Sequence, residues 1–395
     1  MSDCHCLRLD KRTRKCYNIF DYFTVEKREG IERYVFCPLS HRILLFGKGG
    51  GMKTFFSEIV GNRTLCKHLS REITEHRLSH AYIIEGPSGT GKHLIAKQIC
   101  AAISCENSRQ EHLPLPCLQC VSCKKILSGN SPDVIFINRG EKATLGVEAI
   151  RGLKQDVLIP PNDLSAKIYI IEEAHLMTPQ AQNALLLTLE EPPSYVLFFL
   201  LCNSASSLLE TVRSRAPTLR TSLLSEAEIS EYLKKKLPTA AQLAVRDPTA
   251  YSELLSASGG KIGKAMELLE PKKLTALMEK RQTVREFLRI AGARRNSASA
   301  IRLLNGFAAL KREELTERLG EILLALRDLL LCKESDSAPL QFFSDCEEAS
   351  ALAYDFTVPT LLQFCDALYF ATERIRANAN VRLTLTVLAK SCGML

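Results

Sequence analysis

The sequence predicts an α/β fold, in which a parallel sheet covered by helices on both faces is followed by regions made of helices alone. Two observations support this prediction. Between residues 81 and 221, short apolar stretches of strand length alternate with helical stretches, and strands that are apolar throughout are typical of a parallel sheet buried on both faces. After residue 221 the strand-like stretches stop, and helical periodicity continues to the C-terminus.

The predicted elements of the sheet region follow one another in a regular order. Residues 55–80 have helical period and lead into the first predicted strand. We expect strands at residues 81–85, 133–137, 167–172, 195–202 and 217–221. We expect helices between and after them at residues 93–104, 146–158, 178–193 and 207–216, the third of which is closed by Pro192 and Pro193.

The rest of the chain is predicted to be helical. Ser225 followed by Glu228 is a capping box, which opens the first helix after the sheet. Strongly amphipathic stretches at 315–331 and 357–377 predict a packed helical domain from about residue 272 onward. We therefore expect four segments, at residues 1–51, 52–221, 222–271 and 272–395.

The last of these segments also offers apolar residues at helical spacing. Leu361, Phe364 and Leu368 follow the i, i+3, i+7 pattern of one helix face. We expect such apolar faces to contact a partner protein.

Composition and charge limit the class of protein. Of the 395 residues, 46% are hydrophobic and 24% are charged, as in a soluble globular protein, and no apolar run is long enough to span a bilayer. The net charge of +8 permits an anionic partner without requiring one. The opening residues are polar and basic and show no secretory signal, so we expect a cytoplasmic protein whose 15 cysteines are reduced.

Residues 1–51 differ from the rest of the chain, because they mix Cys, Arg and aromatic residues without a clear period. One interpretation is that Met52 is the true start and that the preceding segment is translated upstream sequence. The alternative is a genuine basic extension. In that case Cys4, His5, Cys6 and Cys16 form a possible metal set, although their spacing is poor for one.

A glycine-rich stretch between a predicted strand and a predicted helix has the pattern of a phosphate-binding loop, G-x-x-x-x-G-K. Its glycines let successive backbone N–H groups face one concavity, and the helix N-terminus adds a favourable dipole. Lys92 is expected to neutralise the phosphates, but His93 stands where a hydroxyl normally holds Mg²⁺. The candidate binding residues are Gly86, Pro87, Ser88, Gly89, Thr90, Gly91, Lys92 and His93.

Polar residues that end two later strands are candidates for the chemistry at that loop. Glu172 and Glu173 follow one strand, where the first acid is expected to hold Mg²⁺ through water and the second to polarise an attacking water. Asn203 follows the next strand and is placed to sense a γ-phosphate. The alternatives are two carboxylates that merely end a strand in solvent, and a loop asparagine that makes a turn.

Four cysteines between the loop helix and the second predicted strand have the spacing of a metal site. Cys105 precedes two overlapping C-x-x-C steps formed by Cys117, Cys120 and Cys123. Four thiolates suit tetrahedral Zn²⁺, and such a set has no vacancy for water, so we expect a structural zinc knuckle at residues 105–123. The alternative is four free thiols.

Arg215 lies in "TVRSRA" after the fourth predicted strand. An arginine at this place can project outward toward the γ-phosphate bound by a neighbouring subunit and act as an arginine finger in trans. By periodicity alone, an ordinary exposed surface arginine is the alternative.

Taken together, these motifs resemble a known family. "LSHAYIIEGPSGTGK", the cysteine knuckle, "GNSPDVIFI", "IIEEAHLMTPQAQNALLLTLEEPP" and "TVRSRA" occur in the order seen in bacterial clamp-loader AAA+ subunits of DNA polymerase III. The resemblance runs from Met52 to the C-terminus and is densest between His80 and Ala216. Near the end, "ANANVRLTLTVLAK" resembles the last helix of the collar by which these subunits assemble.

The resemblance implies a RecA-like AAA+ domain, a small helical lid and an all-α collar that joins subunits into a ring-like hetero-pentamer. It implies gamma/tau and delta subunits as partners, contact with the sliding clamp and primed DNA through the complex, and no membrane. The chain departs from the ATPase subunits of the family at His93, Glu172, Leu187, Ala216 and Gly263. Gly263 stands where the lid of the ATPase subunits carries a nucleotide-sensing arginine.

These departures fit subunits of the delta prime type, which have little or no ATPase activity of their own. We therefore expect structural Zn²⁺, weak binding of ATP or ADP, and Mg²⁺ only with bound nucleotide. The alternatives are a catalytic gamma/tau-type ATPase, which would carry Ser or Thr at 93, Asp at 172 and Arg at 263, and a stand-alone zinc-bearing NTPase of nucleic-acid metabolism.

Overall fold

The computed structural model describes residues 33–37, 42–46, 55–110, 113–293, 297–335 and 340–393. Near the N-terminus, β1 (Arg33–Cys37) pairs antiparallel with β2 (Arg42–Phe46), a pairing that the sequence analysis did not predict. Cys4, His5, Cys6 and Cys16, the possible metal set of the extension, lie outside the described residues. Among the described helices, none is both long enough and apolar enough to cross a membrane.

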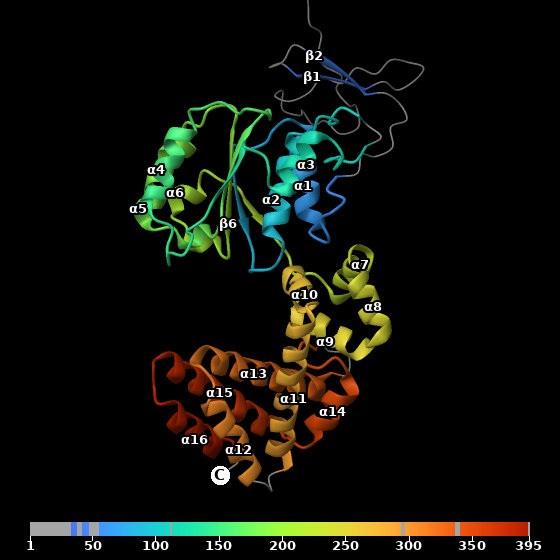
Figure 1. Cartoon of the computed structure of the whole chain (residues 1–395), viewed down its shortest axis with the longest axis vertical. Coiled ribbons are helices and arrows are strands. Elements are labelled where there is room, and N and C mark those ends of the chain that lie inside the picture. The colour runs from blue at the N-terminus through green and yellow to red at the C-terminus, as the bar shows by residue number, and fades with distance from the viewer. Residues whose placement is uncertain are drawn as a thin grey trace, which may run out of the picture.

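A five-stranded parallel sheet is the centre of the upper part of the molecule (Figure 1). Its strand order is β4-β5-β6-β3-β7, and every neighbouring pair runs parallel. The strands are β3 (Ala81–Glu85), β4 (Val134–Ile137), β5 (Lys167–Ile171), β6 (Val196–Cys202) and β7 (Thr218–Arg220). The predicted α/β fold is therefore confirmed, and each expected strand is present within one residue at either end.

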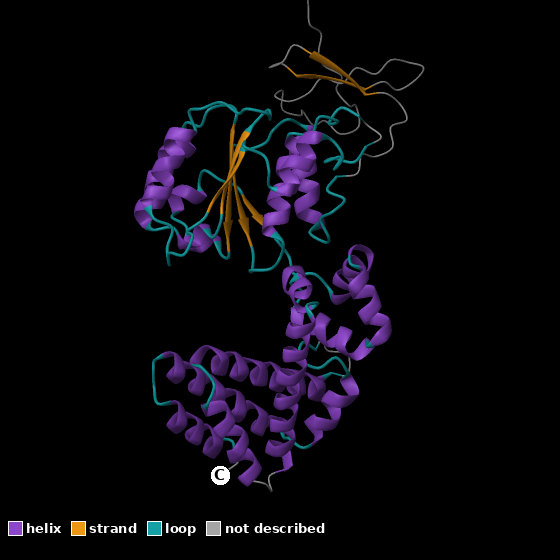
Figure 2. Cartoon of the chain, in the orientation of Figure 1, coloured by secondary structure: helices purple, strands orange, loops and turns teal. Residues whose placement is uncertain are grey.

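Helices cover both faces of this sheet, as Figure 2 shows. One face packs against α1 (Arg63–Thr74), α2 (Lys92–Ile103) and α3 (Val121–Ser128). The other packs against α4 (Val147–Asp156), α5 (Pro179–Glu190) and α6 (Glu210–Arg213). Alternate strand residues serve the two faces: Tyr82 and Ile84 join the first core, whereas Ala81 and Ile83 join the second.

The structure differs from the sequence prediction at the edges of two elements. Residues 55–62 are not helical, and helix α1 begins only after Asn62, whose φ of 49° is left-handed. The Asn62 side chain instead accepts a hydrogen bond from the backbone N–H of Ser222, at 2.8 Å. That contact ties this stretch to the end of the sheet region, which helical periodicity alone does not reveal. Helix α6 is also shorter than predicted, at four residues.

After β7, a small cluster of helices gathers around its own core. It comprises α7 (Glu226–Lys236), α8 (Pro238–Arg246), α9 (Pro248–Ser258) and α10 (Ile262–Leu268). The predicted capping box is present, because the Ser225 hydroxyl accepts from the Glu228 backbone N–H and the Glu228 carboxylate accepts from the Ser225 backbone N–H. Ile229, Leu233 and Leu254 are buried at the centre of this cluster.

The C-terminal helical region is the lower part of Figure 1. Its helices are α11 (Pro271–Ala293), α12 (Ser297–Ala308), α13 (Arg312–Glu334), α14 (Cys346–Tyr354), α15 (Val358–Arg376) and α16 (Val381–Ser391). The expectation that Leu361, Phe364 and Leu368 contact a partner protein is wrong, since all three are at most 2% exposed and lie in the core of this region. An apolar stripe shows that a helix face is buried, but not what buries it.

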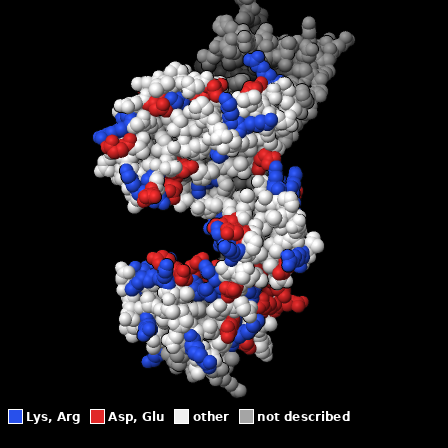
Figure 3. Space-filling view, viewed as in Figure 1, with Lys and Arg blue, Asp and Glu red and all other residues white. Residues whose placement is uncertain are grey.

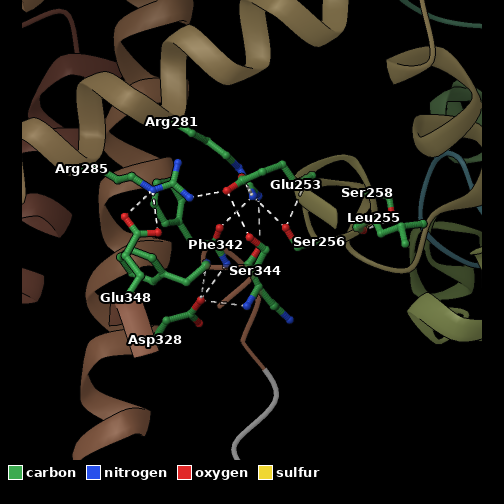
Figure 4. Close-up of polar contacts among 12 residues, drawn as sticks. Glu253, Leu255, Ser256, Ser258, Arg281, Arg285, Asp328, Phe342, Ser344 and Glu348 are labelled. Atoms are coloured by element: carbon green, nitrogen blue, oxygen red, sulfur yellow. Dashed lines mark hydrogen bonds and ion pairs between the residues drawn. The ribbon is translucent and has the colours of Figure 1, made fainter. Parts of the chain in front are cut away.

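A buried network of charges joins the helical cluster to the C-terminal region (Figure 4). Glu253, on α9, is 2% exposed and forms ion pairs with Arg281 and Arg285, on α11. Arg285 also pairs with Glu348, on α14, at 3.0 Å. Because buried charges are tolerated only when they are paired and hydrogen-bonded, this network fixes α9 against α11 and α14.

The loop before α14 is held by Asp328, on α13, and by Arg281 of the same network. The Asp328 carboxylate, which is fully buried, accepts hydrogen bonds from the backbone N–H groups of Gln341, Phe342 and Phe343. Arg281 donates to the backbone carbonyl of Phe342 at 2.7 Å. Side chains from α9, α11, α13 and α14 therefore lie together around this loop. Their network crosses the expected boundary between residues 271 and 272.

We predict that Glu253→Ala destabilises the protein by about 3–5 kcal/mol, because it leaves two buried guanidinium groups without their carboxylate. The measurement is urea unfolding followed by circular dichroism. The matched control is Glu373→Ala, since Glu373 pairs with Arg376 at the surface, where such a pair contributes about 0.5 kcal/mol. Equal free energies of unfolding for the two variants would contradict the prediction.

Candidate functional site

The phosphate-binding loop follows β3 at the carboxyl edge of the sheet and enters α2. Its start is held by the backbone, because the Gly86 N–H donates to the Cys202 carbonyl at 3.1 Å. A Cβ at position 86 would lie 1.9 Å from the Thr221 hydroxyl oxygen, so this place requires glycine. Gly91, which precedes the helix, has a left-handed φ of 86°. The loop therefore has the close backbone approach and turn that phosphate binding needs.

Lys92 is drawn into its own loop. The residue is 8% exposed, and its ammonium group donates to the carbonyls of Gly86 and Pro87 and lies 3.4 Å from Oδ1 of Asn203. Burial lowers the pKa of Lys92. The ammonium group thus lies among oxygen atoms, from which it would have to turn to meet a phosphate.

His93 and Glu172 lie beside each other, although they come from different elements. Nδ1 of His93, in the first turn of α2, is 3.2 Å from Oε1 of Glu172, which follows β5. In phosphate-binding loops of this kind, these are the positions from which the protein reaches Mg²⁺. An imidazole is a poor ligand for an ion that strongly prefers oxygen, so the residues present do not fit a protein-held Mg²⁺.

Glu173 is turned toward a different partner. Its backbone has a left-handed φ of 47°, which is uncommon for a residue other than glycine. Its carboxylate accepts a hydrogen bond from Nε of Arg139, at 2.7 Å. Arg139 lies just beyond β4, so this acid is paired along the edge of the sheet.

Asn203 is in contact with the loop lysine and also with a histidine that the sequence analysis did not single out. Nδ2 of Asn203 lies 3.2 Å from Nε2 of His175. Burial lowers the pKa of His175, which favours a neutral ring that accepts from Asn203. Nδ1 of His175 is buried and has no hydrogen-bond partner in the structure. The only sequence signal for this residue was its place two positions after Glu173.

The helical cluster rests directly on the loop. The backbone N–H of Gly263, in α10, donates to the carbonyl of Gly89 at 2.9 Å. A Cβ at position 263 would lie 3.2 Å from both Cα and O of Gly89, a contact with backbone that cannot easily yield. Glycine at 263 therefore permits this approach, and a longer side chain here would force α10 away from the loop.

Arg215 lies two residues after the end of α6, and its side chain contacts other residues of the same chain. Its guanidinium group is 2.6 Å from a carboxylate oxygen of Glu190, at the end of α5, and donates to the Thr211 carbonyl at 2.8 Å. Its side chain is 33% exposed. The half-buried side chain of Arg215 can reach a neighbouring molecule only if its contact with Glu190 breaks.

The four predicted cysteines come together in space. The sulfur atoms of Cys105, Cys117, Cys120 and Cys123 all lie within 4.8 Å of one another, and those of Cys117 and Cys123 are 4.0 Å apart. Thiolates around tetrahedral zinc, with Zn–S bonds of about 2.3 Å, are about 3.8 Å apart. The cluster can therefore hold a metal ion with only small adjustment.

Backbone groups around the cluster are directed at the sulfur atoms. The N–H of Cys120 donates to the sulfur of Cys117, and the N–H of Cys123 donates to that of Cys120, both at 3.4 Å. Burial raises the pKa of Cys117, but hydrogen bonds from the backbone N–H groups of Gln119 and Cys120, together with those of the Cys105 and Asn107 side chains, outweigh it and lower that pKa to about 6. These donors stabilise a thiolate, which is the form that binds metal. Burial raises the pKa of Cys105 and of Cys123, so of these three thiols Cys117 ionises most readily.

Among the described residues, the face of the molecule shown in Figure 3 has no extended patch made only of basic side chains. There, basic and acidic side chains lie beside one another over both the sheet region and the helical parts. On this face, the net positive charge of the chain therefore offers no extended basic patch for a nucleic acid.

Comparisons with known proteins match part of the chain to subunits of DNA polymerase III. The family described as "DNA polymerase III, delta subunit" matches residues 61–224. The chain is 33% identical over 215 residues to DNA polymerase III subunit tau of Bacillus subtilis, a match that covers 54% of this chain and 37% of that protein. It is 31% identical over 215 residues to DNA polymerase III subunit gamma of Buchnera aphidicola, covering 54% of this chain and 57% of that one.

The chain thus spans between about a third and three fifths of the length of these two curated relatives. Among solved structures, a DNA polymerase III gamma subunit-related protein of Thermotoga maritima aligns over 82% of this chain and 98% of its own, with 18% identity and a TM-score of 0.42. The family match over residues 61–224 spans the sheet, the phosphate-binding loop and the cysteine cluster. Residues 61–224 therefore match the family described as "DNA polymerase III, delta subunit", and about half of the chain is similar in sequence to gamma and tau subunits of DNA polymerase III.

Proposed function

We propose that the chain is a delta prime-like subunit of a bacterial clamp loader. It takes part in DNA replication by helping to load the sliding clamp onto primed DNA, together with gamma/tau and delta subunits in a hetero-pentamer. In this proposal the helical cluster is the lid and the C-terminal helical region is the collar. The subunit binds ATP or ADP weakly and hydrolyses little or none by itself.

The observation that carries the proposal is the contact between His93 and Glu172. Phosphoryl transfer in this class of protein depends on a metal ion that bridges the phosphate oxygens. The two positions that would reach that ion hold a nitrogen ligand and a longer acid, which lie 3.2 Å apart. Gly263 adds no cation from the lid side and brings α10 onto the loop. The loop is thus suited to holding phosphates rather than to cutting them.

The collar offers an apolar surface for partner subunits. On α15 and α16, five large apolar side chains are between 44% and 65% exposed: Leu362, Tyr369, Phe370, Leu383 and Val387. Exposed apolar groups collected on two adjacent helices are typical of a protein–protein interface. We propose this surface as the assembly face, in place of the buried residues Leu361, Phe364 and Leu368.

Arg215 is proposed to act on nucleotide bound by a neighbouring subunit. Its contact with Glu190 is partly exposed to solvent, and exposed ion pairs of this kind contribute little, so assembly could exchange Glu190 for a phosphate.

The cysteine cluster is proposed to hold one structural Zn²⁺, with Cys105, Cys117, Cys120 and Cys123 as its ligands.

A second candidate is a gamma/tau-type ATPase, which the sequence similarity to gamma and tau subunits favours. It also draws support from the intact loop and from the contact between Lys92 and Asn203. The two candidates differ in whether the isolated chain turns over ATP.

We predict zinc in the purified protein, at about one ion per chain, because four thiolates complete a tetrahedral site. Plasma emission spectrometry of protein prepared without chelator measures it. Cys117→Ser should lose most of the zinc and loosen α3 in hydrogen exchange, whereas the exposed Cys346→Ser should keep the ion. Zinc-free wild-type protein would leave the cysteines as free thiols.

We predict that the isolated chain shows no significant ATP turnover in a single-turnover assay with labelled ATP. The physical reason is that its residues do not fit the ion on which phosphoryl transfer depends. Turnover at the rate of a competent loader ATPase, abolished by Lys92→Ala, would favour the gamma/tau-type candidate.

We predict that Arg215→Ala slows ATP hydrolysis in a reconstituted loader without preventing assembly. An arginine finger contributes roughly 10³-fold or more at its own site, and the loss for the whole complex is smaller because other sites continue to act. The measurements are clamp- and DNA-stimulated ATPase and clamp loading.

Phe370→Asp tests the proposed assembly face in the same reconstitution. Because Phe370 is 63% exposed, the variant should stay folded as a monomer, and the charge on the apolar face should keep it from joining the complex. If wild-type chain does not assemble with gamma/tau and delta subunits, the proposed function is wrong. If it assembles but Arg215→Ala behaves as wild type, Arg215 is an ordinary surface residue.

A further inference from the structure

The two positions from which a phosphate-binding loop usually reaches Mg²⁺ are occupied by other residue types in this chain. In loops of this kind the protein reaches the ion directly from the residue after the loop lysine, and through water from the acid at the end of a later strand. In this chain those residues are His93 and Glu172, and they contact each other at 3.2 Å. The two side chains that would flank an ion therefore flank each other.

The chemistry of these donors does not suit the ion. Mg²⁺ takes six ligands in near-ideal octahedral geometry and dehydrates reluctantly, so it is held by oxygen atoms at about 2.0–2.1 Å. His93 supplies no oxygen from its side chain, and one oxygen of Glu172 already faces the imidazole. A nucleotide that arrives with Mg²⁺ would thus gain no direct side-chain ligand from position 93.

The loop keeps the groups that bind phosphate without a metal. Backbone N–H groups at the start of α2 lack partners within the helix, as in any helix, and they are directed at the loop. Lys92 lies at the loop itself and contacts Asn203. The side chain of His93 is 54% exposed, so its contact with Glu172 is a surface contact that a phosphate can displace.

The helical cluster approaches the loop with Lys261, the residue before α10, whose side-chain carbons would lie 3.4 and 3.9 Å from a Cβ at Gly89. Gly263 has no side chain and contacts the backbone of Gly89, and Arg139, the cation nearest Glu173, is engaged with that acid at 2.7 Å. The positive charge at the loop therefore comes from protein side chains, with Lys92 inside the loop and Lys261 packed beside it, and the imidazole of His93 lies next to Lys92.

We propose that this loop binds nucleotide phosphates independently of Mg²⁺. The inference rests on the proposed function in that it concerns the same weak nucleotide site. Linkage is reciprocal: if the protein adds no ligand to the ion, then Mg²⁺ binds the protein-held nucleotide no more tightly than it binds free nucleotide. The affinity for ADP or ATP is therefore the same with the ion and without it.

The test is a fluorescence titration of the purified full-length chain with N-methylanthraniloyl-ADP and with the corresponding ATP, in buffer containing either Mg²⁺ or EDTA. We expect dissociation constants that agree within about twofold between the two buffers. Lys92→Ala should abolish the signal in both buffers, which assigns binding to the loop.

The matched variant is the double substitution His93→Thr with Glu172→Asp, which restores the oxygen ligands. It should gain a dependence on Mg²⁺ of about tenfold or more in the dissociation constant, since a protein-held ion then bridges to the phosphates. Thermal unfolding by circular dichroism checks that this variant is folded.

Three results would overturn the proposal: Mg²⁺ tightens binding to the wild-type chain by about tenfold or more, the wild-type chain binds no nucleotide in either buffer, or the folded double variant stays indifferent to the ion. None of these bears on assembly with partner subunits. Failure of the inference and failure of the proposed function are thus told apart by the titration and the reconstitution.

Discussion

Parallel hydrogen bonding in the five-stranded sheet is the constraint on which the candidate site depends. Because all five strands run in one direction, their carboxyl ends meet at one edge, and the residues that follow them become neighbours. Lys92 and Asn203 come into contact although 111 residues separate them in the chain. Glu172 reaches His93 in the same way. The burial of the strands on both faces keeps this edge fixed while the loops carry the chemistry.

A second constraint organises the helical half. Glu253, Arg281 and Arg285 are buried together, and a charge in such a place is stable only with its partners, so the packing of α9 against α11 has little freedom. The neighbouring helix α10 meets the phosphate-binding loop through Gly263. A continuous path of packed elements therefore runs from the loop to the region proposed for assembly.

The site combines a complete phosphate cradle with an incomplete metal site. The backbone of the loop and Lys92 depend on glycine geometry and on one cation, and both are present. The metal positions depend on oxygen ligands at two places, and there His93 and Glu172 contact each other instead. Binding and hydrolysis thus make separate demands on neighbouring residues.

The sequence by itself determined the features that depend on near neighbours: the five strands, the capping box of Ser225 and Glu228, and the spacing of four cysteines. These follow from backbone geometry and local periodicity, which a short window contains. Only the tertiary structure decided that Glu253 pairs with Arg281, that Asn203 meets His175, and that Leu361 lies in the core rather than at a surface. Each of these outcomes depends on which distant element packs alongside, and a periodic pattern specifies a buried face without naming the partner that buries it.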